Sequence, residues 1–380
     1  MIHIVLGLSG RKTQVQDERI GILLIHGIGD QRQNEFLQQS AENFVKTALI
    51  GYGSPNLHVE MFPGVGRESP LSITLRNEQN TSRFDFHELW WRDLGERPTF
   101  RAKIKFWLWA LSLGGTRGYF WDPIPTTSKL IPQNFSTRLG YVFVHDRLTL
   151  FLKTTYFFLL LAPLLLVFEL AGQIPGVSRF SLVRATFTYL SSVQMYQGRR
   201  SRQGGTLVDF DQTRRISIQR RFVNAVIEMA MRDYDRWYIV AHSLGSVIAF
   251  QGLMLDKHAM ARLVTANRWM NPDFQSFKDT PSSPDSDYPD EPKCPLWLSD
   301  TDCLNQLAIF KKLRGLVTYG SPIETFARTW PAIVHIDPNT LSPGAKLRND
   351  FEWLNIYDPV DVIASKIKSF GIPKDGEAES

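Results

Sequence analysis

The chain of 380 residues contains only two cysteines, Cys294 and Cys303, and both lie in a polar, proline-rich stretch. They allow one disulfide bond if that region is exported, and they are too few to build a metal site. A secretory signal is also missing, because no basic residue precedes the short apolar run at the N-terminus. We therefore expect no bound metal and no export through a signal peptide.

The sequence also lacks a nucleic-acid-binding motif and an internal repeat. Its formal net charge of +5 comes mainly from arginines, which cluster at 199–202 and 214–221. Such clusters are mostly solvated faces, and the alternative is contact with anionic lipid head groups. We expect no nucleic-acid partner, because no recognition motif accompanies the charge.

Apolar residues are plentiful, at 43% of the chain, so the protein can bury a substantial core in one enlarged α/β domain or two ordinary ones. Runs of apolar residues with strand and helix spacing alternate along the chain. We expect strands at 20–26, 57–62, 84–91, 237–241, 313–319 and 353–357, and helices between Asp30 and Gly51, at 214–232 and at 244–255. This alternation predicts a mostly parallel sheet flanked by helices, whereas the composition of 266–300 predicts a loop.

Residues 97–205 depart from the alternation and divide the predicted core into 1–96 and 206–380. They include the apolar segment 154–172 (TTYFFLLLAPLLLVFELAG), in which Glu169 is the only charged residue. A membrane-spanning helix needs roughly 20 mostly apolar residues, and it tolerates a proline such as Pro163. We expect 97–205 to form an inserted cap or membrane-associated segment, with a buried core helix as the alternative for its apolar part.

The strongest catalytic signal is AHSLG at residues 241–245, at a predicted strand-to-helix junction. A nucleophile elbow needs small residues two positions either side of its serine, because the turn is too sharp for larger side chains. Ala241 and Gly245 meet that need. We therefore expect Ser243 to be a nucleophile, with the backbone N–H of Leu244, at a helix N-terminus, facing a developing oxyanion.

A second element, His26-Gly27-Ile28, follows the first predicted strand. An oxyanion hole needs a second backbone N–H from a neighbouring loop, and a glycine at 27 lets that loop lie close to the nucleophile. We expect the N–H of Ile28 to be this donor. His26 lies far upstream of the serine in the chain, so we expect it to stabilise the loop by hydrogen bonding rather than to act as the base.

Four segments together resemble the lipase-like α/β hydrolases: HGIGD (26–30), AHSLGS (241–246), YGSP (319–322) and WLNIYDPVDVI (353–363). The similarity is greatest to membrane-associated bacterial and eukaryotic lipases and to the group containing GPI inositol deacylases, and it does not cover 97–205. It implies an α/β-hydrolase fold and acyl transfer through a serine ester. The usual substrates of such enzymes are lipids or other hydrophobic esters, and no cofactor takes part.

The resemblance also places the acid of a catalytic triad after the strand at 353–357. Asp361, ahead of two apolar residues, is the favoured candidate, and Asp358, which could instead form a turn, is the alternative. This fold orders its triad as serine, acid, histidine, but no histidine follows His335. Three interpretations stay open: the chain is a fragment that lacks the last strand and helix, His335 supplies the base, or the hydrolase is degenerate.

The sequence thus predicts a serine hydrolase that associates with a membrane and cleaves a lipid or other hydrophobic ester. One alternative is a membrane-tethered pseudohydrolase that binds its ligand or partner without turnover. The other is a soluble esterase or thioesterase. Only an activated serine reacts with a fluorophosphonate probe, so such a probe distinguishes the two enzymes from the pseudohydrolase.

Overall fold

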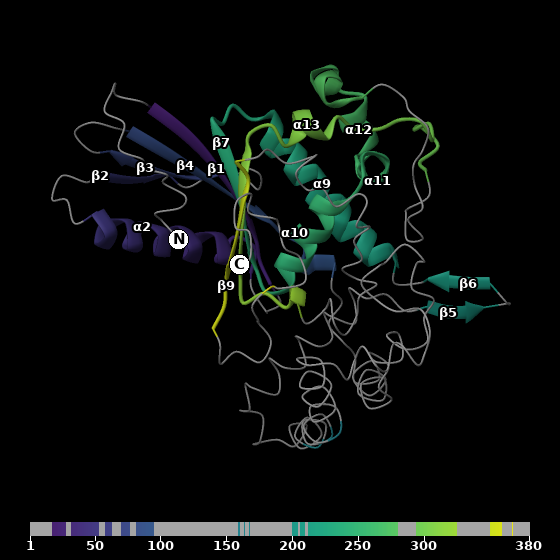
Figure 1. Ribbon diagram of the computed structural model, residues 1–380, viewed down its shortest axis with the longest axis horizontal. Coiled ribbons are helices and arrows are strands. Elements are labelled where there is room, and N and C mark those ends of the chain that lie inside the picture. Colours follow the sequence, from purple (N-terminus) through teal and green to yellow (C-terminus); the bar gives the residue numbers. More distant parts are fainter. Residues whose placement is uncertain are drawn as a thin grey trace, which may run out of the picture.

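The computed structural model describes residues 17–27, 32–52, 58–62, 70–76, 81–94, 200–203, 206–209, 212–279, 294–324 and 350–358, with single residues at 159, 163, 167 and 367. They contain a seven-stranded sheet with the strand order β2-β3-β4-β1-β7-β8-β9 (Figure 1). Five adjacent strands run parallel: β4 (Thr81–Leu89), β1 (Asp17–Ile25), β7 (Arg236–His242), β8 (Leu313–Tyr319) and β9 (Glu352–Ile356). Two antiparallel strands, β3 (Leu71–Arg76) and β2 (His58–Phe62), extend one edge.

Helices cover both faces of this sheet (Figure 1). On one face, Ile22 and Leu24 of β1 belong to the same buried cluster as Phe36 of α2 (Glu35–Tyr52). On the other face, Leu23 and Ile25 pack in the cluster formed by α9 (Gln212–Met231) and α10 (Leu244–Met254). Successive residues of a strand point to opposite faces, so a strand covered on both sides is apolar throughout. The predicted α/β class, with a mostly parallel sheet flanked by helices, is confirmed.

Shorter elements complete the described part of the chain. They are η1 (Arg92–Leu94), β5 (Arg200–Gln203), β6 (Thr206–Asp209), α11 (Lys257–Leu263), α12 (Ala266–Trp269), η3 (Pro272–Phe277) and α13 (Gln306–Ile309). The loop predicted at 266–300 is therefore wrong in its first part, which holds α12 and η3. The side chain of Asn271 caps η3 by accepting the N–H of Asp273 at 2.9 Å, and Phe274 is buried in the main core. Cys294 and Cys303 are free thiols.

The predicted insertion at 97–205 lies outside the described residues, apart from three single positions and β5. Its role as a cap or membrane segment stays a prediction, as does the division of the core around it. Within the ranges that the structure describes, we find no helix with the length and apolar character needed to cross a bilayer.

The side of the sheet on which new strands are added changes between β1 and β7. After β1 the chain builds β2, β3 and β4 on one side, and after β7 it builds β8 and β9 on the other. The two strands end side by side, with Ile25 paired to Ala241. Open α/β sheets bind ligands outside the carboxyl ends of the strands at such a switch point. The residues that follow Ile25 and Ala241 are therefore the candidate site.

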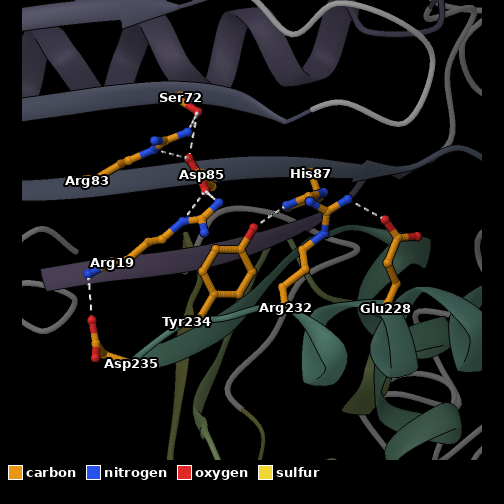
Figure 2. Close-up of polar contacts among 9 residues, drawn as sticks. All are labelled: Arg19, Ser72, Arg83, Asp85, His87, Glu228, Arg232, Tyr234 and Asp235. Carbon is orange, nitrogen blue, oxygen red and sulfur yellow. Dashed lines mark hydrogen bonds and ion pairs between the residues drawn. The ribbon is translucent and has the colours of Figure 1, made fainter. Parts of the chain in front are cut away.

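A cluster of charged side chains stabilises the sheet away from these ends (Figure 2). The carboxylate of Asp85 on β4 is fully buried, and it accepts hydrogen bonds from Arg19 at 2.7 Å, Arg83 at 3.0 Å and Ser72 at 2.6 Å. Burial disfavours the charged carboxylate, but the bonds from Ser72, Arg19 and Arg83 outweigh it, so the pKa of Asp85 is lowered. Unlike an exposed ion pair, this arrangement holds three strands together around one buried charge.

Candidate active site

Ser243 stands at the turn between β7 and α10 in a backbone conformation that side chains rarely adopt. Its φ is 51° and its ψ is −125°. These angles match the first central position of a type II′ turn, which normally belongs to glycine. Besides Ser243, Asn34 has the only positive φ among the described residues other than glycine. Such strain persists where the surrounding structure holds it, and it is concentrated at functional sites.

Two glycines leave the space that this turn requires. A Cβ on Gly245 would lie 2.5 Å from the carbonyl oxygen of Ile25 and 2.7 Å from that of His26. A Cβ on Gly27 would lie 2.6 Å from the Cβ of Ser243. All three distances are shorter than any ordinary carbon contact, so the end of β1 and the turn after β7 meet only because these residues lack side chains.

A backbone hydrogen bond to β8 holds one side of the turn, and the N-terminus of α10 forms the other side. The N–H of Ser243 donates to the carbonyl oxygen of Tyr319, the last residue of β8, at 3.0 Å. Leu244 is buried and begins α10, so its N–H belongs to the first turn of that helix, where N–H groups have no partner within the helix. A negative charge at this position is favoured by the helix dipole as well as by the N–H groups.

His26 is engaged by the loop and by a tryptophan. Its Nδ1 lies 2.8 Å from the carbonyl oxygen of Gly27 and must donate to it. The ring stacks on Trp91 at 5.0 Å between centroids, and the Trp91 indole N–H donates to the His26 carbonyl at 3.0 Å. Burial lowers the pKa of His26 to about 4, so the ring is neutral at pH 7. These contacts hold the end of β1 in place.

His242, which precedes the nucleophile, lies on the α2 face of the sheet. Its ring stacks on Tyr319 at 4.7 Å and lies 6.4 Å from the ring of Phe36. Because neighbouring strand residues point to opposite faces, this ring belongs to the packing between β7, β8 and α2.

The other predicted site residues are divided between described and undescribed segments. Asp358 follows the end of β9 and is exposed. Ile28, Asp361 and His335 lie outside the described residues, so their roles as oxyanion donor, acid and base stay predictions. In the part of the chain that is described, no group of three or more His, Cys, Asp or Glu side chains could hold a metal ion.

A carboxyl group near the end of β4 was not predicted from the sequence. Glu88 accepts the backbone N–H of Asn34 at 2.6 Å, just before α2 begins. Burial raises the pKa of Glu88 to about 7, although the hydrogen bond from Asn34 acts in the opposite direction. A carboxylate in an otherwise apolar and aromatic strand end, HELWW, was the available signal for it.

The contact between two buried hydroxyl groups behind the nucleophile was not predicted either. Ser246, in the first turn of α10, and Ser321, in the turn after β8, lie 2.7 Å apart through their Oγ atoms. Neither residue is exposed to solvent. They are 75 residues apart in sequence, and no spacing rule connects them.

Comparison with known proteins does not suggest a function, so a function has to be argued from this geometry. No protein-family model, no curated protein and no solved structure matches the chain.

Proposed function

We propose that the protein is a serine hydrolase with an α/β-hydrolase fold and that Ser243 is its nucleophile. The backbone conformation of Ser243 carries the proposal. A serine with only a packing role gains nothing from a φ of 51°, since glycine would occupy that position without strain. A strained serine between a parallel strand and a helix N-terminus, closely approached by Gly27, has the features of a nucleophile elbow.

The proposed reaction is hydrolysis of an ester in two steps. The Ser243 Oγ bonds to the carbonyl carbon of the ester while its proton passes to a base. The carbonyl oxygen becomes negative and accepts the N–H of Leu244, with that of Ile28 as the proposed second donor. The C–O bond to the alcohol then breaks, and the alcohol leaves with the proton. Water releases the acid from Ser243 in the second step, and no cofactor is needed.

The base for this reaction is not assigned to a described histidine. His26 is held by Gly27 and Trp91, and His242 by its stacking on Tyr319. His258 is buried in α11, with Nδ1 at 3.2 Å from the carbonyl oxygen of Asp302. We therefore place the base outside the described residues.

Within the chain, His335 is the remaining histidine after the nucleophile. The proposed acid is Asp361, with Asp358 as the alternative. An inactive pseudohydrolase is the second candidate function, because the histidine contacts described above leave the nucleophile without an assigned proton acceptor.

Labelling by a fluorophosphonate probe tests the proposal, because only an activated serine reacts. We expect the native chain to be labelled at Ser243 and the Ser243→Ala variant to be unlabelled. Ser72→Ala, which removes another buried serine hydroxyl, is the matched control and should be labelled normally. Absence of labelling in the native chain would favour the pseudohydrolase, and labelling of Ser243→Ala at another serine would contradict the nucleophile assignment.

We further propose a lipid or other hydrophobic ester as the substrate and a membrane as the site of action. The apolar segment 154–172 supports this part of the proposal. We expect the protein to sediment with membranes and to resist extraction by high salt and alkaline carbonate. Release by salt alone would indicate binding through the arginines instead. Recovery as a soluble monomer without detergent would favour a soluble esterase or thioesterase.

A further inference from the structure

The turn Gly320-Ser321-Pro322, after β8, has no role in the reaction proposed above. Its hydroxyl group nevertheless points at the elbow. Ser321 and Ser246 are both fully buried, and their Oγ atoms are 2.7 Å apart. The Oγ of Ser246 is also 2.5 Å from the carbonyl oxygen of Ser243. A chain of hydrogen bonds therefore connects the turn after β8 to the backbone of the nucleophile.

The donors in this chain follow from the chemistry of its two ends. A carbonyl oxygen only accepts, so the Ser246 hydroxyl must donate its single proton to Ser243. The Ser246 Oγ then acts as acceptor toward Ser321, whose hydroxyl must donate to it. The Oγ of Ser321 accepts in turn the backbone N–H of Ile323 at 3.3 Å. Every proton in the chain thus points toward the carbonyl group of Ser243.

This carbonyl group belongs to the strained residue. It also accepts the N–H of Ser246 at 3.0 Å, while the N–H of Ser243 is held by Tyr319. The two peptide groups that define φ and ψ of Ser243 are therefore both held, and β8 with its following turn contributes to both. A strained backbone persists only when its surroundings fix it in this way.

We propose that Ser246 and Ser321 are positioning residues for Ser243, which keep its hydroxyl in the reactive orientation by fixing its backbone carbonyl. This inference rests on the proposed function, because it assigns a role within the same site. Both hydroxyl groups are buried, so we assign neither of them a contact with the substrate. A displacement of about 1 Å in a reacting group can lower a rate by about 100-fold, so loss of the chain should slow the reaction of Ser243 markedly.

The test is the rate at which a fluorophosphonate labels Ser243 in the full chain, measured per folded molecule. We expect Ser246→Ala to lower the maximal labelling rate by about 10- to 100-fold with little change in the concentration that gives half the maximal rate. Ser321→Ala should have a smaller effect, because the bond from Ser246 to Ser243 survives. The double variant should match Ser246→Ala alone, since among the described residues Ser321 is connected to the carbonyl group through Ser246. Ser72→Ala should label at the native rate.

Hydrogen exchange of a peptide covering 241–247 gives an independent readout. We expect faster exchange there in both serine variants and native exchange in Ser72→Ala. Failure of the native chain to react with the probe would count against the proposed function, and hydrogen exchange alone would then decide the positioning role. Labelling rates within twofold of native in both variants, or native exchange in both, would overturn the inference. So would additive effects in the double variant.

Discussion

Gly27 and Ser243 approach so closely that a Cβ on the glycine would lie 2.6 Å from the Cβ of the serine. The same Cβ would lie 2.9 Å from the carbonyl oxygen of His242, which is backbone and cannot rotate away. The contact joins the end of the first strand to the turn after β7. A substitution at Gly27 therefore tests directly whether the geometry around Ser243 matters for the reactivity of its hydroxyl group.

We expect Gly27→Ala to push the elbow away from the end of β1, with a loss of stability of about 1–3 kcal/mol. Labelling of Ser243 should fall by about 100-fold or more in the molecules that remain folded. Labelling rate and urea unfolding measure the two effects.

Gly21→Ala, within β1, is the matched control, because its Cβ would meet the side chains of Met229 and Tyr234 at similarly short distances, away from Ser243. It should lose stability and keep its labelling rate. Equal labelling of Gly27→Ala and the native chain would show that the close approach has no functional role.

Strain at Ser243 predicts an unusual order of stability among its variants. Ser243→Ala keeps the Cβ and with it the strain, whereas glycine adopts a φ of 51° readily. Relief of about 1–3 kcal/mol of strain exceeds the cost of about 0.5–1 kcal/mol in chain entropy. We expect Ser243→Gly to be more stable than Ser243→Ala by about 1 kcal/mol in urea unfolding, with neither variant labelled. An alanine variant as stable as the glycine variant would show that the turn is relaxed.

Buried His26 and partly buried His87, which lies on β4, should make the protein less stable in acid. Burial lowers the pKa of His26 and of His87 to about 4, from an ordinary value of 6.5. Each ring is neutral when folded between these values and binds a proton on unfolding, so the free energy of unfolding rises with pH from about 4 to 6.5. One proton corresponds to about 1.4 kcal/mol per pH unit. His87→Gln should reduce this slope by about one proton, measured by urea unfolding at several pH values. An unchanged slope would contradict a lowered pKa for His87.

Glu88 should act in the opposite direction. Burial raises its pKa from 4.5 to about 7, so in this window the folded protein holds a proton that the unfolded chain releases. Its contribution therefore lowers stability as the pH rises from about 4.5 to 7. Glu88→Gln keeps an acceptor for the N–H of Asn34 and removes the titration. We expect the stability of this variant to rise more steeply with pH than that of the native chain. A shallower rise would exclude a raised pKa.

The charge of Asp85 should contribute more to stability than either of its arginine partners does alone. Asp85→Ala would leave Arg19 and Arg83 beside a buried space without their shared carboxylate (Figure 2). Removal of one partner from a buried ion pair costs about 3–5 kcal/mol. The side chain of Arg83 is 49% exposed, so Arg83→Met should cost at most about 1 kcal/mol. Similar losses in urea unfolding for the two variants would contradict this difference.

Local sequence patterns were sufficient for much of the fold. The apolar runs at 20–26 and 237–241 predicted the two central strands, because a strand covered on both faces must be apolar throughout. β3 was missed, although its six residues, LSITLR, alternate apolar and polar side chains in the way that is typical of a half-buried strand. The helices at 266–277 were missed because they are short and depend on the Asn271 cap and on the burial of Phe274.

The candidate site could also be predicted only in part from local sequence. A strand-to-helix junction with small residues around Ser243 is visible in a five-residue window, so its position could be predicted. The contact between Ser246 and Ser321 joins segments 75 residues apart and exists only once β7 and β8 are paired. Glu88 acquires its raised pKa from burial, for which the apolar and aromatic neighbours in HELWW were only an indirect signal. Ile28, Asp361 and His335 stay predictions.

The position of β1 has a consequence for biosynthesis. This strand is made well before β7, its partner on one side; the N–H of Arg19 bonds to Asp235, 216 residues later. Ribosomes add about 5–20 residues per second, so roughly 10–40 s pass before that edge is covered. Throughout this interval the nascent chain carries an apolar strand with an open edge, which is prone to aggregation. Pairing of β1 with β7 thus waits until 216 further residues have been added, and we expect the newly made protein to depend on chaperones that shield β1.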